Sequence, residues 1–173
     1  MEPIKTTVEE LKKTLDADVV VLRGLPGSGK SSFSKAIENQ KVIVCSADYY
    51  HMVDNKYVWK KENAGKAHSS CLFDFISNIT GMIQNDFVLK IIVDNTNTTM
   101  SEIETYLKIA TAYDLKTAVV CFNVSPETSF KRNIHGVPVK TIARMSENLE
   151  KSRRHLLACC KRLGIEYYEI DGE

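Results

Sequence analysis

An octapeptide of the form G-x-x-x-x-G-K-S, residues 24–31, constrains the fold of this chain more than any other segment. An apolar run at residues 19–22 precedes it as a buried strand would, and a helical pattern at residues 32–39 follows it. A strand, a glycine-rich loop and a helix in this order form a phosphate-binding loop, whose backbone N–H groups converge on phosphate oxygens. The positive end of the helix adds to the attraction. The sequence therefore predicts binding of a nucleoside triphosphate.

The parts of this phosphate loop (residues 24–31) have separate expected contacts. The predicted phosphate-binding residues in and next to it are Gly24, Pro26, Gly27, Ser28, Gly29, Lys30, Ser31 and Ser32. Lys30 places a positive charge near the β- and γ-phosphates, and the hydroxyl group of Ser31 reaches Mg²⁺. ATP and Mg²⁺ are therefore the expected ligands, and the preference for ATP over GTP follows only from the resemblance described below.

The size and composition of the chain fit one globular domain. Its 173 residues are 43% hydrophobic and 26% charged, and we expect a single domain over residues 1–173. The five cysteines form no C-x-x-C pair, so we expect reduced, buried thiols. No apolar stretch approaches the roughly 18 residues of a membrane span, and the N-terminus lacks the pattern of a signal peptide. We expect an intracellular protein, cytoplasmic or nuclear, without a membrane partner.

Strand and helix patterns alternate along the chain. The expected strands are residues 19–23, 41–46, 89–94, 117–123 and 166–170. Helical patterns lie between them, and a capping box at Thr7 and Glu10 opens a short N-terminal helix. This alternation predicts an α/β fold with a doubly wound, mainly parallel five-stranded sheet and helices on both faces. Because such sheets bind ligands at the carboxyl ends of their strands, the residues after each strand are the candidates for a site.

Two acidic residues follow expected strands. Asp48 comes after the second strand, where a carboxylate can orient an acceptor hydroxyl group and take its proton during phosphoryl transfer. Capping of a helix is the alternative interpretation of Asp48. Asp94 ends the third strand, and we expect it to hold Mg²⁺ together with Ser31 or to position the acceptor.

A basic segment after the fourth strand has the composition of a lid over phosphates. Arg132 and His135 precede a Gly-Val-Pro tract that ends one helix and begins another, and Arg144 lies about two turns into the second helix. Cations here can stabilise the charge that shifts in phosphoryl transfer, whereas a solvated helix face is the alternative. The sequence predicts a basic helical lid at about residues 125–150.

Aromatic and basic residues are interleaved between Tyr49 and Lys61. Such a segment can stack bases and neutralise a nucleic-acid backbone, or it can pack a loop against the sheet, and the spacing leaves both interpretations open. An open groove at this segment favours an oligonucleotide as acceptor, whereas a closed pocket favours a small molecule.

Five blocks in this order resemble those of small P-loop kinases: residues 23–31, 46–50, 67–68, 93–97 and 132–138. The chain from about residue 18 to residue 150 resembles the bacteriophage-type polynucleotide 5′-hydroxyl kinases, and within them the kinase-like ATP-binding domain of animal proteins that also carry a nicking-nuclease (Smr) domain. The resemblance implies a P-loop kinase sheet of adenylate-kinase-like strand order. It also implies Mg²⁺-dependent transfer of the γ-phosphate of ATP to a 5′-hydroxyl group of single-stranded or end-bearing DNA or RNA.

The resemblance also implies roles for single residues. It makes Asp48 the general base and Lys30 and Arg132 catalytic, with His135 and Arg144 as further phosphate contacts. The expected acceptor-binding residues are Asp48, Tyr49, His51, Asp94 and Asn97.

Two positions depart from the family pattern. His51 and His135 stand where the family has arginines, and a neutral imidazole cannot supply the bidentate fork of a guanidinium group. Two alternatives therefore remain: a kinase of a nucleoside, sugar or nucleotide sugar, and a module that binds or hydrolyses ATP without transferring phosphate.

Overall fold

A six-stranded parallel sheet forms the centre of the computed structural model, which describes residues 1–54, 56–85 and 90–172. The strand order is β1-β8-β7-β2-β6-β3. The strands are β1 (Ile4–Thr6), β2 (Val19–Gly24), β3 (Val42–Cys45), β6 (Lys90–Val93), β7 (Thr117–Asn123) and β8 (Glu166–Asp171). A separate antiparallel pair consists of β4 (Met52–Val53) and β5 (Lys56–Tyr57).

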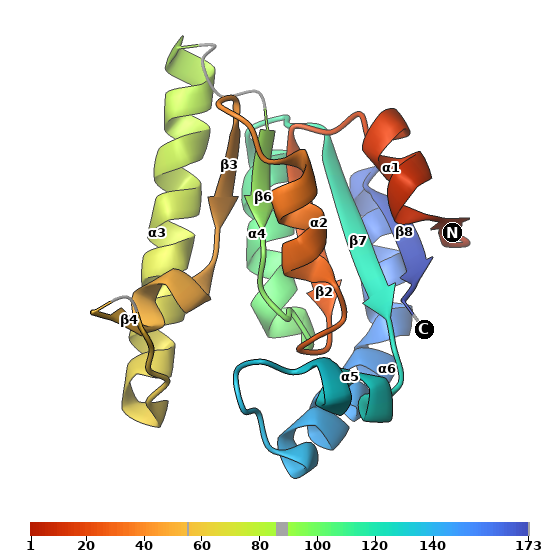
Figure 1. The fold of residues 1–173 in the computed structure, drawn as a ribbon. Helices are drawn as coiled ribbons and strands as arrows, with labels where there is room; N and C mark the ends of the chain where they lie inside the picture. Colours follow the sequence, from red (N-terminus) through yellow and green to blue (C-terminus); the bar gives the residue numbers. More distant parts are fainter. Residues whose placement is uncertain (55, 86–89, 173) are drawn as a thin grey trace.

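Helices cover both faces of the sheet (Figure 1). The helical segments are α1 (Val8–Thr14), α2 (Lys30–Ile37), the 3₁₀ helix η1 (Ala47–His51), α3 (Lys61–Asn85), α4 (Met100–Ala112), α5 (Pro126–Arg132) and α6 (Val139–Leu163). Side chains alternate along the central strand β2: Val19 and Val21 share a core cluster with α3, α4 and α6, whereas Val20 and Leu22 share one with α1 and α2. Because both faces are buried, β2 is a continuous apolar run rather than an alternating one.

The predicted α/β fold is confirmed, and the predicted strand count was wrong by one. The additional strand β1 pairs in parallel with β8, in the register Ile4 with Tyr168. β1 has three residues, none of them buried, so backbone hydrogen bonds place it at the edge without an apolar signal in the sequence. The third predicted strand began at residue 89, which lies outside the described residues; the described strand begins at Lys90.

The carboxyl ends of the central strands meet α5 and the start of α6 at one end of the sheet (Figure 1). β2 leads into the phosphate loop, β3 into η1, and β6 into the turn before α4. Capping residues fix the helices on this side, since Thr99 closes a capping box with Glu102 at the start of α4. None of the helices in the described ranges combines the length and the apolar character needed to cross a bilayer.

Candidate active site

The phosphate loop is shaped by its contact with α5. Gly27 has φ +69°, and a Cβ atom on it would lie 2.9 Å from the carbonyl carbon of Arg132. The hydroxyl group of Ser129 donates a hydrogen bond of 2.6 Å to the carbonyl oxygen of Pro26. Glycine is therefore required at position 27 for two reasons, the left-handed backbone and the close approach of α5.

Lys30 is buried at the start of α2. Its Nζ donates hydrogen bonds to the carbonyl oxygens of Gly24 at 3.0 Å and Leu25 at 2.8 Å. Burial lowers the pKa of Lys30 to about 8, and the carboxylates of Asp94 and Asp48 oppose this shift. An anion at the loop favours the charged ammonium, so this lysine is suited to a phosphate ligand.

Asp94 joins the ends of β6 and β3. Its backbone N–H donates to the carbonyl oxygen of Cys45, its own carbonyl oxygen accepts from Ser46 Oγ, and its Oδ2 accepts a 2.9 Å hydrogen bond from Ser34. Asp94 is buried, and it faces the same cavity as Ser31. One carboxylate and one hydroxyl fit the preference of Mg²⁺ for oxygen ligands and for sites completed by water and substrate phosphates.

Asp48 stands at the start of η1 with its carboxylate in contact with two other segments. Ser46 is the N-cap, since its Oγ accepts from the N–H of Asp48, so Asp48 is not needed as the cap. The hydroxyl group of Tyr57 donates to Asp48 Oδ1 at 3.1 Å, and Nε2 of His135 lies 3.8 Å from Oδ2. Burial and the negative charge of Asp48 raise the pKa of Tyr57, so its phenol stays protonated and remains a donor.

Two histidines lie on either side of Tyr57. The ring of His51 meets that of Tyr57 edge-on at a centroid distance of 5.9 Å, and the ring of His135 lies 4.2 Å from it. His51 is 5% exposed, and within the described part of the chain its Nδ1 atom is buried without a hydrogen-bond partner. The sequence predicted His51 as an acceptor contact and His135 as a phosphate contact, and the structure places both in the lining of one cavity with Asp48.

These residues surround one cavity of about 680 Å³, called the site cavity below. The phosphate loop, Asp48 and Asp94 line one part of it, and α3 and the segment after β5 line another. The lid contributes Arg132 and residues 134–138, followed by Thr141 and Met145 of α6. A volume of this size lies within the range of small-molecule sites, about 300–1,000 Å³.

Arg132 is exposed at the end of α5 and lines the site cavity. Its Nη1 atom donates to the carbonyl oxygen of Gly172, 2.5 Å away. The guanidinium group therefore has one partner from the C-terminal segment and further N–H groups for other acceptors.

Four of the predicted site residues lie outside the lining of the site cavity. Tyr49 and Arg144 are exposed elsewhere on η1 and α6. Asn97 is buried with φ +45°, and its Nδ2 atom donates to the carbonyl oxygen of Leu22, which ties the turn after β6 to β2. Gly24 has φ +145°, and a Cβ atom there would lie 2.7 Å from a carbonyl oxygen of β7.

The sequence analysis missed the role of Arg23. Its guanidinium group is buried and donates to the carbonyl oxygens of Asn97 and Leu149 and, at 2.7 Å, to Ser152 Oγ. Arg23 thus links β2, the turn after β6 and α6 immediately before the phosphate loop. The sequence did contain a sign of this role, because Arg23 is a single charged residue in an otherwise apolar strand.

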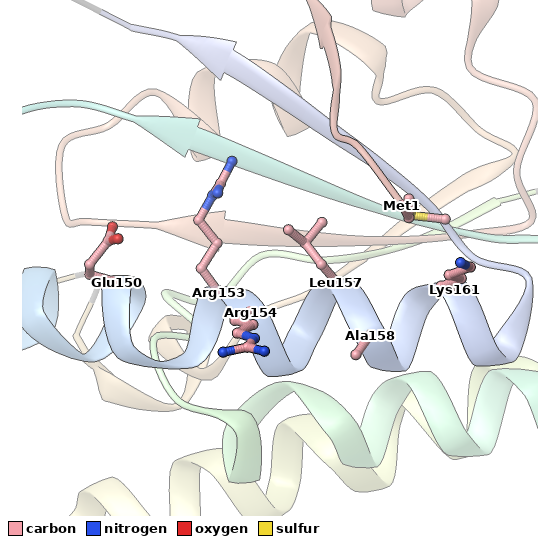
Figure 2. A pocket seen from close by; sticks show the side chains of 7 residues that line it. All are labelled: Met1, Glu150, Arg153, Arg154, Leu157, Ala158 and Lys161. Carbon is pink, nitrogen blue, oxygen red and sulfur yellow. The ribbon is translucent and has the colours of Figure 1, made fainter.

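A second, smaller groove of about 410 Å³ lies along the second half of α6 (Figure 2). It is lined by Met1, Glu150, Arg153, Arg154, Leu157, Ala158 and Lys161. Arg153 points toward the sheet, where its Nε and Nη2 atoms each lie 2.9 Å from Glu169. Arg153 is therefore already paired with a carboxylate of the sheet, Glu169.

Known proteins are similar to this chain in sequence or in fold. NEDD4-binding protein 2 of Homo sapiens is 27% identical over 155 residues, which are 86% of this chain and 8% of that protein. A chain of the Pnkp1/Rnl/Hen1 RNA repair complex has a TM-score of 0.63 at 16% identity, over 79% of this chain and 45% of the other. A chain of AvrRxo1-ORF1:-ORF2 with ATP has a TM-score of 0.58 at 15% identity, over 89% and 54%.

The family assignment covers most of the domain. Residues 19–151 match the family AAA_33, described as an AAA domain, and this range contains the phosphate loop, Asp48, Asp94 and Arg132. The resemblance to P-loop kinases is thereby confirmed. The chain belongs to the AAA_33 family of AAA domains and has a P-loop kinase-like fold.

Proposed function

We propose that this protein is a Mg²⁺-dependent kinase that moves the γ-phosphate of ATP to the 5′-hydroxyl end of a nucleic acid. The observation that carries the proposal is the presence of Asp48 and the phosphate loop in one cavity. Phosphoryl transfer to a hydroxyl group needs an anion cradle for the donor and a carboxylate for the acceptor, and the site cavity holds both.

The donor side consists of the phosphate loop, Lys30, Ser31 and Asp94. The backbone N–H groups of the loop and Lys30 bind the phosphates, while the Ser31 hydroxyl and the Asp94 carboxylate hold Mg²⁺. When bound, Mg²⁺ neutralises negative charge on the β- and γ-phosphates. The structure with ATP among the similar folds supports ATP as the donor.

The acceptor side is built around Asp48. Because Tyr57 donates to Oδ1, the carboxylate has a fixed orientation and Oδ2 can accept the proton of the acceptor hydroxyl group. The acceptor oxygen then forms a bond to the γ-phosphorus while the bond between this phosphorus and the bridging oxygen breaks, and ADP leaves. Arg132 and His135 line the same cavity, and in this proposal they offset the charge that shifts in this step.

Two features support a nucleic acid as the acceptor. The fold is similar to that of a chain in an RNA repair complex that contains Pnkp1. The aromatic side chains of Tyr57 and Trp59 line the site cavity, and the exposed Lys60 and Lys61 follow directly. Base stacking and neutralisation of a phosphate backbone need this combination.

Transfer of labelled γ-phosphate tests the proposal. ATP and Mg²⁺ are offered with 5′-hydroxyl DNA, 5′-hydroxyl RNA, a nucleoside and sugar mixture, or buffer alone. We expect label on an oligonucleotide, and Asp48→Asn should lower kcat by about 10²- to 10⁴-fold with unchanged ATP affinity. Asp54→Asn, the same change at an exposed aspartate on the neighbouring turn, should retain activity.

The other results each contradict a named part of the proposal. Label only on a nucleoside or sugar would assign a small acceptor. Label only as free phosphate would indicate ATP hydrolysis without transfer. Full transfer by Asp48→Asn would remove the carboxylate from the mechanism.

A further inference from the structure

The single tryptophan of the chain, Trp59, lines the site cavity and has no role in the donor chemistry. It is 55% exposed, and Ile134 of the lid, which lines the same cavity, is 87% exposed. Ala64 and His68 of α3 complete this apolar and aromatic part of the lining. Exposed large apolar side chains gathered at a cavity indicate a binding surface rather than a folding requirement.

The cavity lining places Trp59 near the acceptor side. The N–H of Val58 donates to the carbonyl oxygen of His51 at 2.7 Å, which continues the antiparallel pairing of β4 and β5 by one residue. Trp59 follows directly and lines the site cavity together with Tyr57, whose hydroxyl group contacts Asp48.

We propose that Trp59 is the stacking platform for a nucleobase of the acceptor strand, and that Ile134 covers the opposite face of that base. The inference rests on the proposed function and makes it more specific. A donor nucleotide is fixed by its phosphates at the loop, whereas Trp59 lines the cavity two residues after Tyr57, which contacts the carboxylate that receives the acceptor hydroxyl. The base on Trp59 therefore belongs to the acceptor.

The proposal selects a class of acceptor. Stacking on an aromatic side chain accepts every base, because each base has a π face. A single-stranded 5′-hydroxyl end of any sequence is a substrate on this basis, and a sugar without a base is not. The exposed Lys60 and Lys61 provide positive charge for the phosphates that follow the first nucleotide.

Tryptophan fluorescence tests the platform without requiring activity. All tryptophan emission comes from Trp59, so a base stacked on it changes the signal. A short single-stranded 5′-hydroxyl oligonucleotide should quench the emission in the wild type, and also in Asp48→Asn, in which transfer is slowed. ATP alone and ribose should leave it nearly unchanged.

Kinetics of Trp59 variants provide the second readout. Trp59→Ala should raise KM for the oligonucleotide by about 5- to 150-fold with little change in kcat or in KM for ATP. Trp59→Phe should recover most of the affinity because it keeps an aromatic face. Phe73→Ala removes an aromatic side chain that is 69% exposed on α3 outside the site cavity, and it should behave as wild type.

The failure of the platform is distinguishable from the failure of the kinase proposal. Normal transfer to oligonucleotides by Trp59→Ala, with no quenching in the wild type, would overturn the platform and leave the kinase intact. Quenching by ATP alone, with a raised KM for ATP in Trp59→Ala, would assign the platform to the donor and overturn the inference. Quenching by the oligonucleotide without any transfer would support the platform and contradict the kinase.

Discussion

At the scale of single residues, burial of Lys30 has a cost in stability that its proposed phosphate ligand would offset. Its ammonium group is surrounded by carbonyl oxygens of its own loop and shielded from water. Desolvation lowers the pKa from 10.5 to about 8, although Asp94 and Asp48 act in the opposite direction. The protonated side chain therefore destabilises the ligand-free protein at neutral pH, and a bound phosphate removes this penalty.

The pKa of Lys30 predicts how stability depends on pH. Between pH 8 and pH 10.5 the unfolded chain binds more protons at this lysine than the native protein, so the wild type gains stability as the pH rises. Relative to Lys30→Met, it should gain about 2 kcal/mol between about pH 7 and about pH 9.5. Urea unfolding of both ligand-free proteins measures this difference.

The control for this experiment is Lys35→Met, which removes an exposed lysine from the same helix. The change with pH in the stability difference from wild type should be larger for Lys30→Met than for Lys35→Met. A stability difference between wild type and Lys30→Met that does not change with pH would mean that Lys30 is not desolvated.

Site residues could be predicted from the sequence where they act together with residues next to them in the sequence. The phosphate loop is recognisable because its glycines and lysine act within eight consecutive residues. The contact of Tyr57 with Asp48 was not predicted, because it depends on how the β4–β5 pair packs against η1. Asn97 lies in a predicted block, but its side chain bonds to β2, 75 residues away in the sequence.

At the scale of elements, capping fixes where α4 begins beside the site. The N–H of Glu102 donates to Thr99 Oγ1, and the carboxylate of Glu102 accepts from the N–H of Thr99. Thr99→Ala removes the first of these contacts and should lower the free energy of unfolding by about 1 kcal/mol. Chemical denaturation measures the loss.

Thr80→Ala is the matched control for the cap. Thr80 is an exposed threonine inside α3, where alanine is the better helix former, so its replacement should be neutral or slightly stabilising. An equal loss in both variants would indicate that threonine at position 99 contributes something other than capping.

Helices and strands with an apolar pattern of their own were predicted from the sequence. Strands that form only because another segment pairs with them were not. The strand at residues 117–123 and the long last helix have apolar patterns that are independent of the rest of the chain, and the structure contains both. Gly164 ends that helix with φ +69°, the left-handed conformation that glycine adopts readily after a helix. By contrast, β1 and the β4–β5 pair are strands only because another segment supplies their hydrogen bonds.

At the scale of the whole molecule, every cysteine of the chain is buried, and four of the five belong to one core cluster. Cys45 and Cys121 lie in strands, Cys71 in α3, and Cys159 and Cys160 in α6, and all five are buried free thiols. Burial raises the pKa of Cys45 and of Cys160 to about 12. This agrees with the expectation of reduced thiols inside the domain.

These thiols should report opening of the whole domain. At about pH 8 a maleimide reagent should label none of them in the time that labels all five in denaturant, because the native fold excludes the reagent. Protection should exceed about 10³-fold, as expected when labelling requires unfolding. Thr105→Cys adds an exposed thiol on α4 and should label once at the rate of the unfolded chain. Rapid labelling of a native cysteine, found by mass spectrometry, would locate an element that opens independently of the rest of the domain. Because β3 lies at the edge of the sheet, Cys45 would be the first cysteine to show such labelling.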